Sequence, residues 1–293
     1  MGVRGSEWVA SAALLLVAAL WGLTFPLIRG ALASVDPFHF VAARFALAAL
    51  AFLPWVLASP APRRGLPAAL GPGFALGALA CASYLTQTLG LRTVPAGRAA
   101  FITGTNVVLV PLLAPLFGRG VPRRIDLAGA LLSLVGLLLM TRPEVAGFSA
   151  GDLWVLACAF FYALYIHALQ QVLARGIDTT ALAFSQVAGL CVSSALCLPL
   201  AEGPSHFTAS AWLAVSFCAL LATVGTFWLQ THFQGRTSPE RAALLFATEP
   251  VFAAFFAALL LGERTTPREG VGAALVFLAV LLVELWPKPA PAG

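Results

Sequence analysis

Two stretches of the chain, QTLGLRTVPAGRAAFITGTN at residues 87–106 and QTHFQGRTSPERAALLFATE at residues 230–249, decide the fold that we expect. They share Gln-Thr at the start, Arg-Ala-Ala in the middle and Thr near the end, all at an offset of 143 residues. Weaker matches lie outside them: Trp21-Gly22-Leu23-Thr24 near Tyr162-Ala163-Leu164-Tyr165, and Leu116-Phe117-Gly118-Arg119 over Leu260-Leu261-Gly262-Glu263. Similarity at one fixed spacing indicates a duplicated unit.

The composition predicts that lipid surrounds most of this duplicated chain. Hydrophobic residues make up 60% of it, charged residues 10%, and the mean hydropathy is +0.92. Soluble domains carry about 25% charged residues, so this chain lacks the polar side chains to cover a water-facing surface. In lipid, only helical bundles and closed barrels pair all backbone groups. The apolar runs are long and do not alternate with polar residues, which favours helices.

A helix needs about 20 apolar residues to cross the hydrocarbon core of a bilayer. Prolines, glycines and charged residues divide the chain into ten such candidates. We therefore expect an all-α, polytopic membrane protein whose ten spans are residues 8–29, 38–58, 70–91, 96–117, 125–141, 151–173, 180–200, 209–233, 239–261 and 268–286.

The repeat divides these spans into residues 1–145 and residues 146–293, with five helices in each half. Because five is odd, the second half must enter the membrane upside down relative to the first. Inverted repeats of this kind place a substrate site near the bilayer midplane, where the halves meet, and permit alternating access by rocking. The repeat therefore points to transport of a small-molecule substrate.

The basic residues predict the orientation. With the N-terminus inside, the inner loops carry Arg4, Arg63, Arg64, Arg119, Arg123, Arg124, Arg175, Arg236, Arg241 and Lys288, and the outer loops carry Arg29, Arg92, Arg98, Arg142, Arg264 and Arg268. The larger inner set predicts that both termini are cytoplasmic. This placement also explains the net charge of +5 without nucleic-acid binding, because no basic stripe with interleaved aromatics is present.

Glu249 is the principal candidate for a functional group, since it lies halfway along the ninth span and is followed by Pro250. A carboxylate at the bilayer centre costs about 2.5–3.5 kcal/mol on insertion scales, so it should face a cavity or a partner. Pro250 has no N–H and frees the carbonyl of Phe246, which loosens the helix. Glu249 could bind a substrate amine or cation, exchange a proton, or only tie helices together.

Other polar and aromatic residues at mid-span depth are candidates for the wall of the same cavity. Asn106 is the repeat mate of Glu249, Gln87 and Gln230 are repeat mates, and Tyr84 lies one helical turn before Gln87. Trp21 with Thr24 and Tyr162 with Tyr165 form two pairs spaced by three residues. Pro26, Pro111 and Pro250 are candidate kinks. For each side chain, helix packing is the alternative. Arg44, inside the second span, could reach the interface, pair with Glu249 or pair with the C-terminal carbonyls of a neighbouring helix.

No P-loop, zinc motif or glycine-rich phosphate loop occurs, so we expect no cofactor. The five cysteines lie in apolar runs without C-x-x-C spacing and are expected to be small buried side chains, with no metal site. The protein should meet membrane lipids, and protons are a candidate coupling ion. Its oligomeric state stays open.

Three sequence features resemble EamA-type transporters of the drug/metabolite transporter superfamily: WGLTF at residues 21–25, Arg44-Phe45, and EPVFAAFFAALLLGE at residues 249–263. The resemblance implies a ten-helix exporter of a bacterial inner membrane, with a central cavity lined by spans 1, 3, 4, 6, 8 and 9. It also implies substrates such as amino acids and other metabolites. The first half departs from the pattern, with Asn106-Val107 in place of Glu249-Pro250.

The sequence thus predicts a secondary transporter, an exporter of small organic solutes such as apolar or aromatic amino acids, and not an enzyme. The alternative is a membrane-embedded enzyme that acts on a lipid or prenyl substrate. Such an enzyme needs clustered acids or histidines for metal–phosphate chemistry, whereas the acids here are scattered singly.

Overall fold

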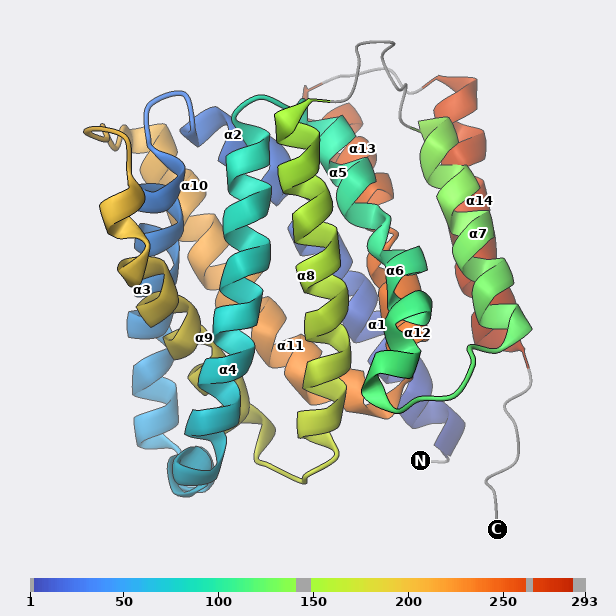
Figure 1. The fold of residues 1–293 in the computed structure, drawn as a ribbon, viewed down its shortest axis with the longest axis horizontal. Helices are drawn as coiled ribbons and strands as arrows, with labels where there is room; N and C mark the ends of the chain where they lie inside the picture. Colours follow the sequence, from blue (N-terminus) through green and yellow to red (C-terminus); the bar gives the residue numbers. More distant parts are fainter. Residues whose placement is uncertain (1–2, 141–148, 262–265, 287–293) are drawn as a thin grey trace.

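The computed structural model describes residues 3–140, 149–261 and 266–286, and within these every regular element is helical (Figure 1). The elements are α1 (Val3–Gly22), α2 (Thr24–Ala31), α3 (Pro37–Ala58), α4 (Pro60–Leu91), α5 (Ala96–Gly104), α6 (Asn106–Leu113), η1 (Ala114–Phe117), α7 (Arg124–Met140), α8 (Ala150–Leu173), α9 (Thr179–Leu196), η2 (Leu198–Leu200), α10 (Ala209–Ala219), η3 (Leu220–Gly225), α11 (Thr226–Phe233), η4 (Gln234–Arg236), α12 (Pro239–Phe246), α13 (Glu249–Leu261) and α14 (Pro267–Leu285).

Several of these helices are long and apolar enough to cross a membrane. In the described residues there are seven such segments: Glu7–Ala31, Pro37–Ala58, Pro60–Leu91, Ala96–Phe117, Ala150–Leu173, Thr179–Leu196 and Ala209–Arg236. Described helix also occurs in the other three predicted ranges, but the count of ten spans stays a prediction. Arg142, Arg264, Lys288, the Gly262-Glu263 part of the repeat and the Arg4 side chain lie outside the described residues.

The outside of the bundle is apolar, unlike that of a soluble protein, and polar side chains are buried inside beside an apolar core. Large apolar side chains such as Leu50, Leu116 and Leu213 are 67%, 74% and 69% exposed on the outside of the bundle. The interior instead holds fully buried polar side chains, among them His167 and Gln230. This arrangement follows from lipid as the outer solvent, because lipid tails do not penalise exposed leucine and leave polar groups to pair inside.

Capping residues fix where the helices begin. Asp36 accepts a hydrogen bond from the Phe38 N–H (2.9 Å) at the start of α3, and Ser149 forms a reciprocal capping box with Asp152 at the start of α8. The predicted start of the third span, residue 70, is wrong by ten residues. The helix α4 begins at Pro60, because proline suits the first helical turn and the interior Pro67 and Pro72 do not end the helix.

Four interruptions occur partway along the helices: between α1 and α2 at Leu23, between α5 and α6 at Thr105, in the π-helical turn η3, and between α12 and α13 at residues 247–248. Pro26 and Pro250 each lie within three residues after an interruption, as expected for residues that cannot donate a backbone hydrogen bond. Pro111 lies inside α6 and not at an interruption, so its predicted role as a kink does not account for the break at Thr105.

Helices from the two halves of the chain pack closely against each other. The most extensive contact is between α4 and α9, where Gly77 of α4 lies against the backbone of Gln186 and Gly189. A Cβ atom at position 77 would lie 2.4 Å from the Gln186 carbonyl oxygen, which is inside van der Waals contact. Small residues let helices in lipid come together in this way.

We therefore expect Gly77→Ala to lower the free energy of unfolding by about 1–3 kcal/mol, because the backbones of α4 and α9 must separate. Thermal unfolding of the purified protein in detergent measures the change. Gly71→Ala is the matched control on the same helix, since a Cβ there meets nothing within 4 Å. Equal melting temperatures for the two variants would contradict the close approach.

Candidate functional site

A small cavity lies at the interruptions of the helices, and we call it the central cavity. Its lining comes from α1, α2, α4, α5, α8 and α13 and consists of Trp21, Thr24, Ser83, Tyr84, Gln87, Thr103, Cys158, Tyr162 and Glu249. Its volume of about 30 Å³ gives room for one or two water molecules. A solute of amino-acid size therefore needs the surrounding helices to move apart.

Six of the nine predicted substrate-binding residues line this cavity. They are Trp21, Thr24, Tyr84, Gln87, Tyr162 and Glu249. They come from distant parts of the chain, and both halves contribute. Of the predicted spans, the eighth contributes no lining residue, because its Gln230 lies behind Tyr162.

Glu249 is the one ionisable carboxylate among the lining residues. It begins α13 and is 8% exposed, and no hydrogen bond or ion pair joins its side chain to another described residue. The carboxylate therefore faces the cavity without a protein partner. Gly22 permits this placement, since a Cβ there would lie 2.7 Å from the backbone oxygen of Glu249. An acid in this setting can bind a cationic group or a proton.

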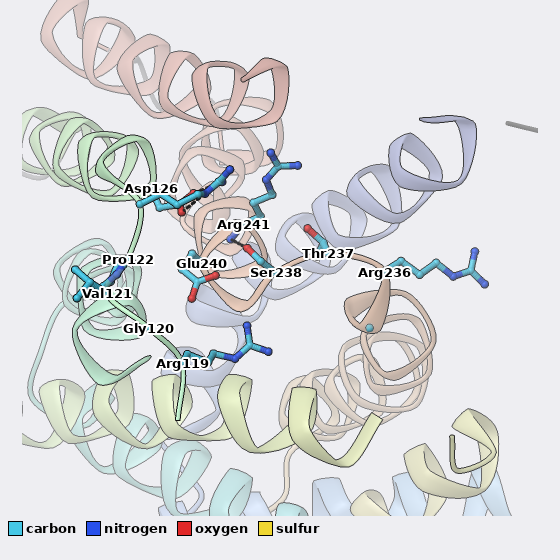
Figure 2. A pocket seen from close by; sticks show the side chains of 12 residues that line it. Arg119, Gly120, Val121, Pro122, Asp126, Arg236, Thr237, Ser238, Glu240 and Arg241 are labelled. Atoms are coloured by element: carbon cyan, nitrogen blue, oxygen red, sulfur yellow. Dashed lines mark hydrogen bonds and ion pairs between the residues drawn. The ribbon is translucent and has the colours of Figure 1, made fainter. Parts of the chain in front are cut away.

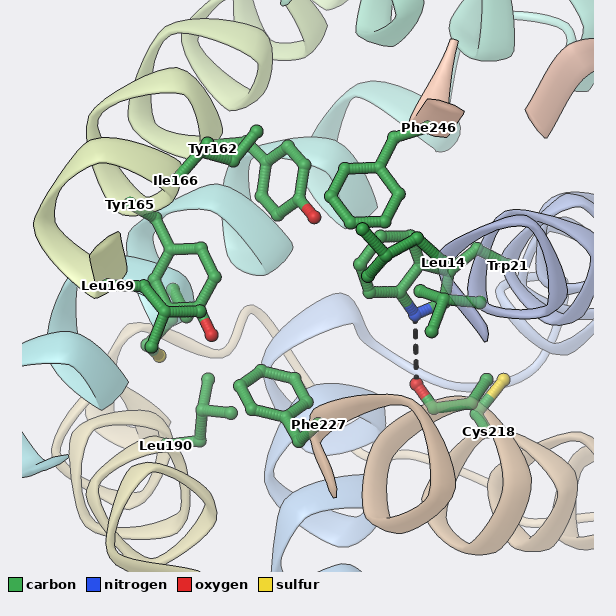
Figure 3. Packing of buried hydrophobic residues seen from close by; sticks show 14 of the residues in the cluster. Leu14, Trp21, Tyr162, Tyr165, Ile166, Leu169, Leu190, Cys218, Phe227 and Phe246 are labelled. Atoms are coloured by element: carbon green, nitrogen blue, oxygen red, sulfur yellow. Dashed lines mark hydrogen bonds between the residues drawn. The ribbon is translucent and has the colours of Figure 1, made fainter. Parts of the chain in front are cut away.

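Aromatic rings form one side of the cavity (Figure 3). The Trp21 and Tyr162 rings meet edge to face with centroids 5.6 Å apart, and Phe246 lies 5.3 Å from Trp21. The Trp21 indole N–H donates to the Ala222 carbonyl (3.3 Å) and to the Thr226 hydroxyl (3.2 Å). The aromatic wall is thus tied to the π-helical turn η3 and to α11.

Three predicted cavity residues, Asn106, Tyr165 and Gln230, do not line it in this structure. Tyr165 points away and donates to Gln186 Oε1 (2.6 Å), while Gln230 donates to the Tyr162 hydroxyl (3.1 Å) from behind. Asn106 is 2% exposed, and its Oδ1 has no hydrogen-bond partner among the described residues. Repeat symmetry gives the depth of these residues, but packing turns their side chains away from the cavity.

Sequence reasoning missed three lining residues, Ser83, Thr103 and Cys158. Ser83 donates to the Cys158 carbonyl (3.1 Å), and Thr103 accepts from Gln87 Nε2 (3.3 Å). The available signal was spacing, since Ser83 adjoins Tyr84 and Cys158 lies one turn before Tyr162. Small polar residues in apolar runs otherwise resemble ordinary helix-packing positions.

Arg44 lies directly behind Tyr84 and is 2% exposed. Its Nε donates to the Thr223 hydroxyl (2.9 Å) and its Nη2 to the Ala222 carbonyl (2.8 Å), both in η3. Its guanidinium lies 4.7 Å from the centre of the Tyr84 ring. Of the predicted alternatives, the last is the nearest, but the carbonyl belongs to the π-helical turn within the segment Ala209–Arg236 and not to the C-terminal end of that segment. The π-helical turn supplies this acceptor because its widened hydrogen-bonding pattern frees carbonyls.

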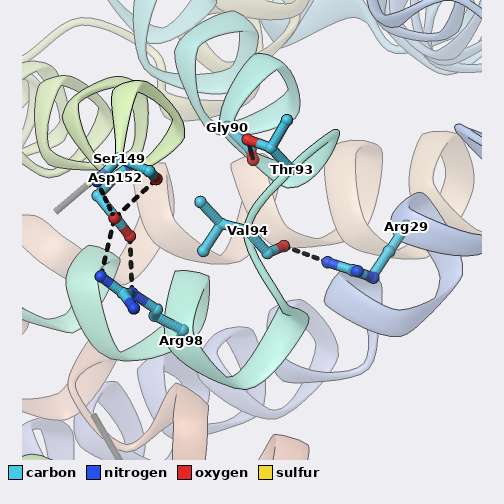
Figure 4. Close-up of polar contacts among 7 residues, drawn as sticks. All are labelled: Arg29, Gly90, Thr93, Val94, Arg98, Ser149 and Asp152. Atoms are coloured by element: carbon cyan, nitrogen blue, oxygen red, sulfur yellow. Dashed lines mark hydrogen bonds and ion pairs between the residues drawn. The ribbon is translucent and has the colours of Figure 1, made fainter. Parts of the chain in front are cut away.

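The chain is tightly joined at the face of the bundle opposite to the start of α1 and the end of α14 (Figures 1 and 4). Arg98 of α5 makes two hydrogen bonds of 2.8 Å to Asp152 of α8, a bidentate pair whose carboxylate is 1% exposed. Arg29 of α2 donates to the Val94 carbonyl nearby. These contacts join α2, the loop before α5, α5 and α8 at that face.

Within the described residues, no three His, Cys, Asp or Glu side chains gather in a way that could hold a metal ion. Of the five cysteines expected to be buried, Cys81, Cys158 and Cys218 are buried free thiols, whereas Cys191 and Cys197 are only half-buried.

Sequence comparison identifies the family. The sequence profile of the EamA-like transporter family matches residues 8–142 and, again, residues 149–285. The chain belongs to the EamA-like transporter family. It is 34% identical over 276 residues to an uncharacterized transporter of Archaeoglobus fulgidus, covering 94% of this chain and 86% of the relative. It is 27% identical over 286 residues to a probable amino-acid metabolite efflux pump of Salmonella typhimurium, covering 92% of each.

A crystal structure, at 20% sequence identity, matches the fold of this EamA-like transporter with a TM-score of 0.76 and covers 94% of this chain and 96% of the other. Family membership confirms the resemblance drawn from WGLTF and EPVFAAFFAALLLGE. Together with the long apolar helices, it makes the chain a multi-pass membrane transporter of a small-molecule substrate.

We expect Arg44→Lys to lower the free energy of unfolding by about 1.5–3 kcal/mol, because lysine cannot keep both hydrogen bonds to η3 and the contact with the Tyr84 ring. Thermal unfolding of the EamA-like transporter in detergent measures this. Arg92→Lys is the control, since Arg92 is 46% exposed and pairs with an exposed Glu202. A loss no larger than that of the control would mean that η3 does not depend on the guanidinium.

Proposed function

We propose that this EamA-like transporter exports small organic metabolites, amino acids with apolar or aromatic side chains in particular, by alternating access around the central cavity. The observation that carries the proposal is Glu249, a buried carboxylate that faces an aromatic and amide-lined cavity without a protein partner. A substrate ammonium would supply the missing partner, and the rings of Trp21, Tyr84 and Tyr162 would hold an apolar side chain.

An inverted repeat of two five-helix units, residues 1–145 and 146–293, is part of the proposal. The family profile matches twice, once in each unit. The repeat mates α5 and α12 run in opposite directions in Figure 1, as an inverted pair would. The interruptions that follow α5 and α12 also contain residues that are repeat mates, Thr105 and Thr248. Thr105 and Thr248 both turn their hydroxyls back to the carbonyl three residues earlier, at 2.6 Å in each case.

The proposed substrate class rests on the lining and on the relatives. Relatives from Salmonella typhimurium and Escherichia coli are each named a probable amino-acid metabolite efflux pump. The residues Trp21, Tyr84 and Tyr162 offer apolar ring faces, and Gln87 offers an amide that can bind a carboxylate or a carbonyl. This combination suits a solute with one apolar end and one polar end.

We place the chain in a bacterial inner membrane with both termini in the cytoplasm. The clustering of Arg119, Arg123, Arg236 and Arg241 at the face where α1 begins and α14 ends supports this orientation. The coupling has two alternatives, proton antiport through Glu249 or facilitated diffusion. An imposed pH gradient that accelerates export in the wild type but not in Glu249→Gln would favour antiport.

We expect purified protein in proteoliposomes to export L-phenylalanine or L-leucine, and Glu249→Gln to reduce the initial rate at least about tenfold, because the substrate ammonium loses its charged partner. Rates of release of radiolabelled amino acid from loaded vesicles provide the measurement.

Glu202→Gln is the control, because it removes the same charge from an exposed side chain outside the cavity. Equal rates for the two variants would remove Glu249 from the substrate site. No release of any of the twenty amino acids by the wild type would overturn amino-acid export.

A further inference from the structure

A second and larger cavity, which we call the arginine pocket, opens at the face where α1 begins and α14 ends (Figures 1 and 2). Its volume is about 470 Å³, and it shares no lining residue with the central cavity. Its walls come from the loop between η1 and α7 and from the loop that leads through η4 into α12. It therefore lies where loops from both halves of the chain meet.

Most of the charges in the arginine pocket already have partners. Arg123 makes two hydrogen bonds to Asp126, of 2.8 and 2.7 Å, and these raise the pKa of Arg123 above its usual range. Arg241 donates to the Val283 carbonyl (3.0 Å), and Arg236 bonds His232 (3.1 Å). The donors of these groups are engaged within the fold, although only Arg123 has a carboxylate partner within hydrogen-bond distance.

Arg119 and Glu240 are different. Neither side chain makes a hydrogen bond or an ion pair within 4.0 Å to any residue in the described part of the chain. Figure 2 shows the two side chains entering the pocket from separate walls, Arg119 from the loop after η1 and Glu240 from the first turn of α12. One cation and one anion without a hydrogen-bonding partner thus share a space that is large enough for a small solute, and the charge of Glu240 also acts on the nearby Arg123.

We infer that the arginine pocket binds zwitterions of the amino-acid class, with the carboxylate on Arg119 and the ammonium on Glu240. A simple anion would be attracted by Arg119 but repelled by Glu240. A simple cation would be attracted by Glu240 but repelled by Arg119. Only a ligand that carries both charges gains both charge-assisted hydrogen bonds. Arginine suits a carboxylate because its planar fork can donate two parallel bonds.

A line of buried side chains connects the arginine pocket to the central cavity. Gly235 lines the pocket, and the neighbouring Gln234 accepts a hydrogen bond from Gln230 (2.8 Å). Gln230 also donates to the hydroxyl of Tyr162, which lines the central cavity. Both glutamines are fully buried, and Gln230 Oε1 has no partner among the described residues. Buried amides are normally satisfied, so this line favours a path that takes up water or solute when it opens.

The arginine pocket is therefore a loading site, from which the solute passes to Glu249. This role rests on the proposed export function, whereas the binding of zwitterions does not. The test consequently measures binding and transport separately, on the full-length protein purified in detergent and in proteoliposomes.

Binding is measured with radiolabelled L-phenylalanine in the Glu249→Gln protein, so that the central cavity contributes least. We expect Arg119→Gln and Glu240→Gln each to weaken the remaining binding about tenfold. Unlabelled 2-phenylethylamine, which lacks the carboxylate, and 3-phenylpropionate, which lacks the ammonium, should each compete at least about tenfold less well than L-phenylalanine.

Arg64→Gln is the matched control, because it removes the same charge from an exposed side chain outside the pocket. Size-exclusion chromatography verifies that each variant is folded, and the two independent pocket variants guard against a local defect in either. Absence of binding, equal binding by the Arg119→Gln and Arg64→Gln proteins, or equal competition by the amine would overturn the zwitterion site.

Transport separates this inference from the proposed function. In proteoliposomes with otherwise wild-type protein, we expect Arg119→Gln to raise KM about tenfold with little change in maximal rate. Binding that depends on Arg119 without any export would remove the proposed function and keep the zwitterion site. Export that depends on Glu249, with an unchanged KM in Arg119→Gln, would keep the proposed function and remove the arginine pocket as a loading site.

Discussion

Backbone groups at the interrupted helices must find partners inside the protein, and the rest of the site depends on how they do so. An unpaired carbonyl in the hydrocarbon region costs several kcal/mol, because no water is present to bind it. Here threonine hydroxyls supply some of the hydrogen-bond donors. Thr24, Thr105 and Thr248 each donate to the carbonyl three residues earlier. The interruptions can therefore lie at mid-helix, where continuous helices would leave no space for a cavity.

The π-helical turn η3 meets the same constraint in another way. Its Ala222 carbonyl accepts hydrogen bonds from both Arg44 and Trp21, so a cation of α3 and an indole of α1 converge on one backbone oxygen. Arg44 stacks on Tyr84 and Trp21 meets Tyr162 edge to face, so two walls of the central cavity are held from η3. A change in this turn would move both walls together, which links the backbone geometry of η3 to the shape of the cavity.

Much of the architecture and about two-thirds of the candidate site could be predicted from the sequence. Glu249, Trp21 and Gln87 are conspicuous because polar or indole side chains are costly or unusual at mid-span. Asn106, Tyr165 and Gln230 were also at the right depth, but the direction of a side chain depends on how its helix is rotated against its neighbours. That rotation follows from contacts such as Gly77 on α9, which periodicity in an almost wholly apolar helix does not reveal. The turn η3 has no proline and only one glycine, and its sequence, LLATVG, gives no distinctive signal.

The two faces of the bundle are closed to different degrees, and this difference determines what transport would require. At one face, Arg98 and Asp152 join α5 to α8 by a bidentate pair, and breaking it would leave the buried Asp152 carboxylate without its charged partner. At the other face, the arginine pocket holds about 470 Å³ of open space between loops. The hydrogen-bonded side chains of Gln234, Gln230 and Tyr162, with the Phe246 ring packed on Tyr162, lie on the side of the central cavity that faces this pocket. Neutral hydrogen bonds are individually weaker than a buried ion pair. The two faces therefore differ in what joins the helices: a buried carboxylate with its arginine partner at one face, and an open pocket between loops at the other.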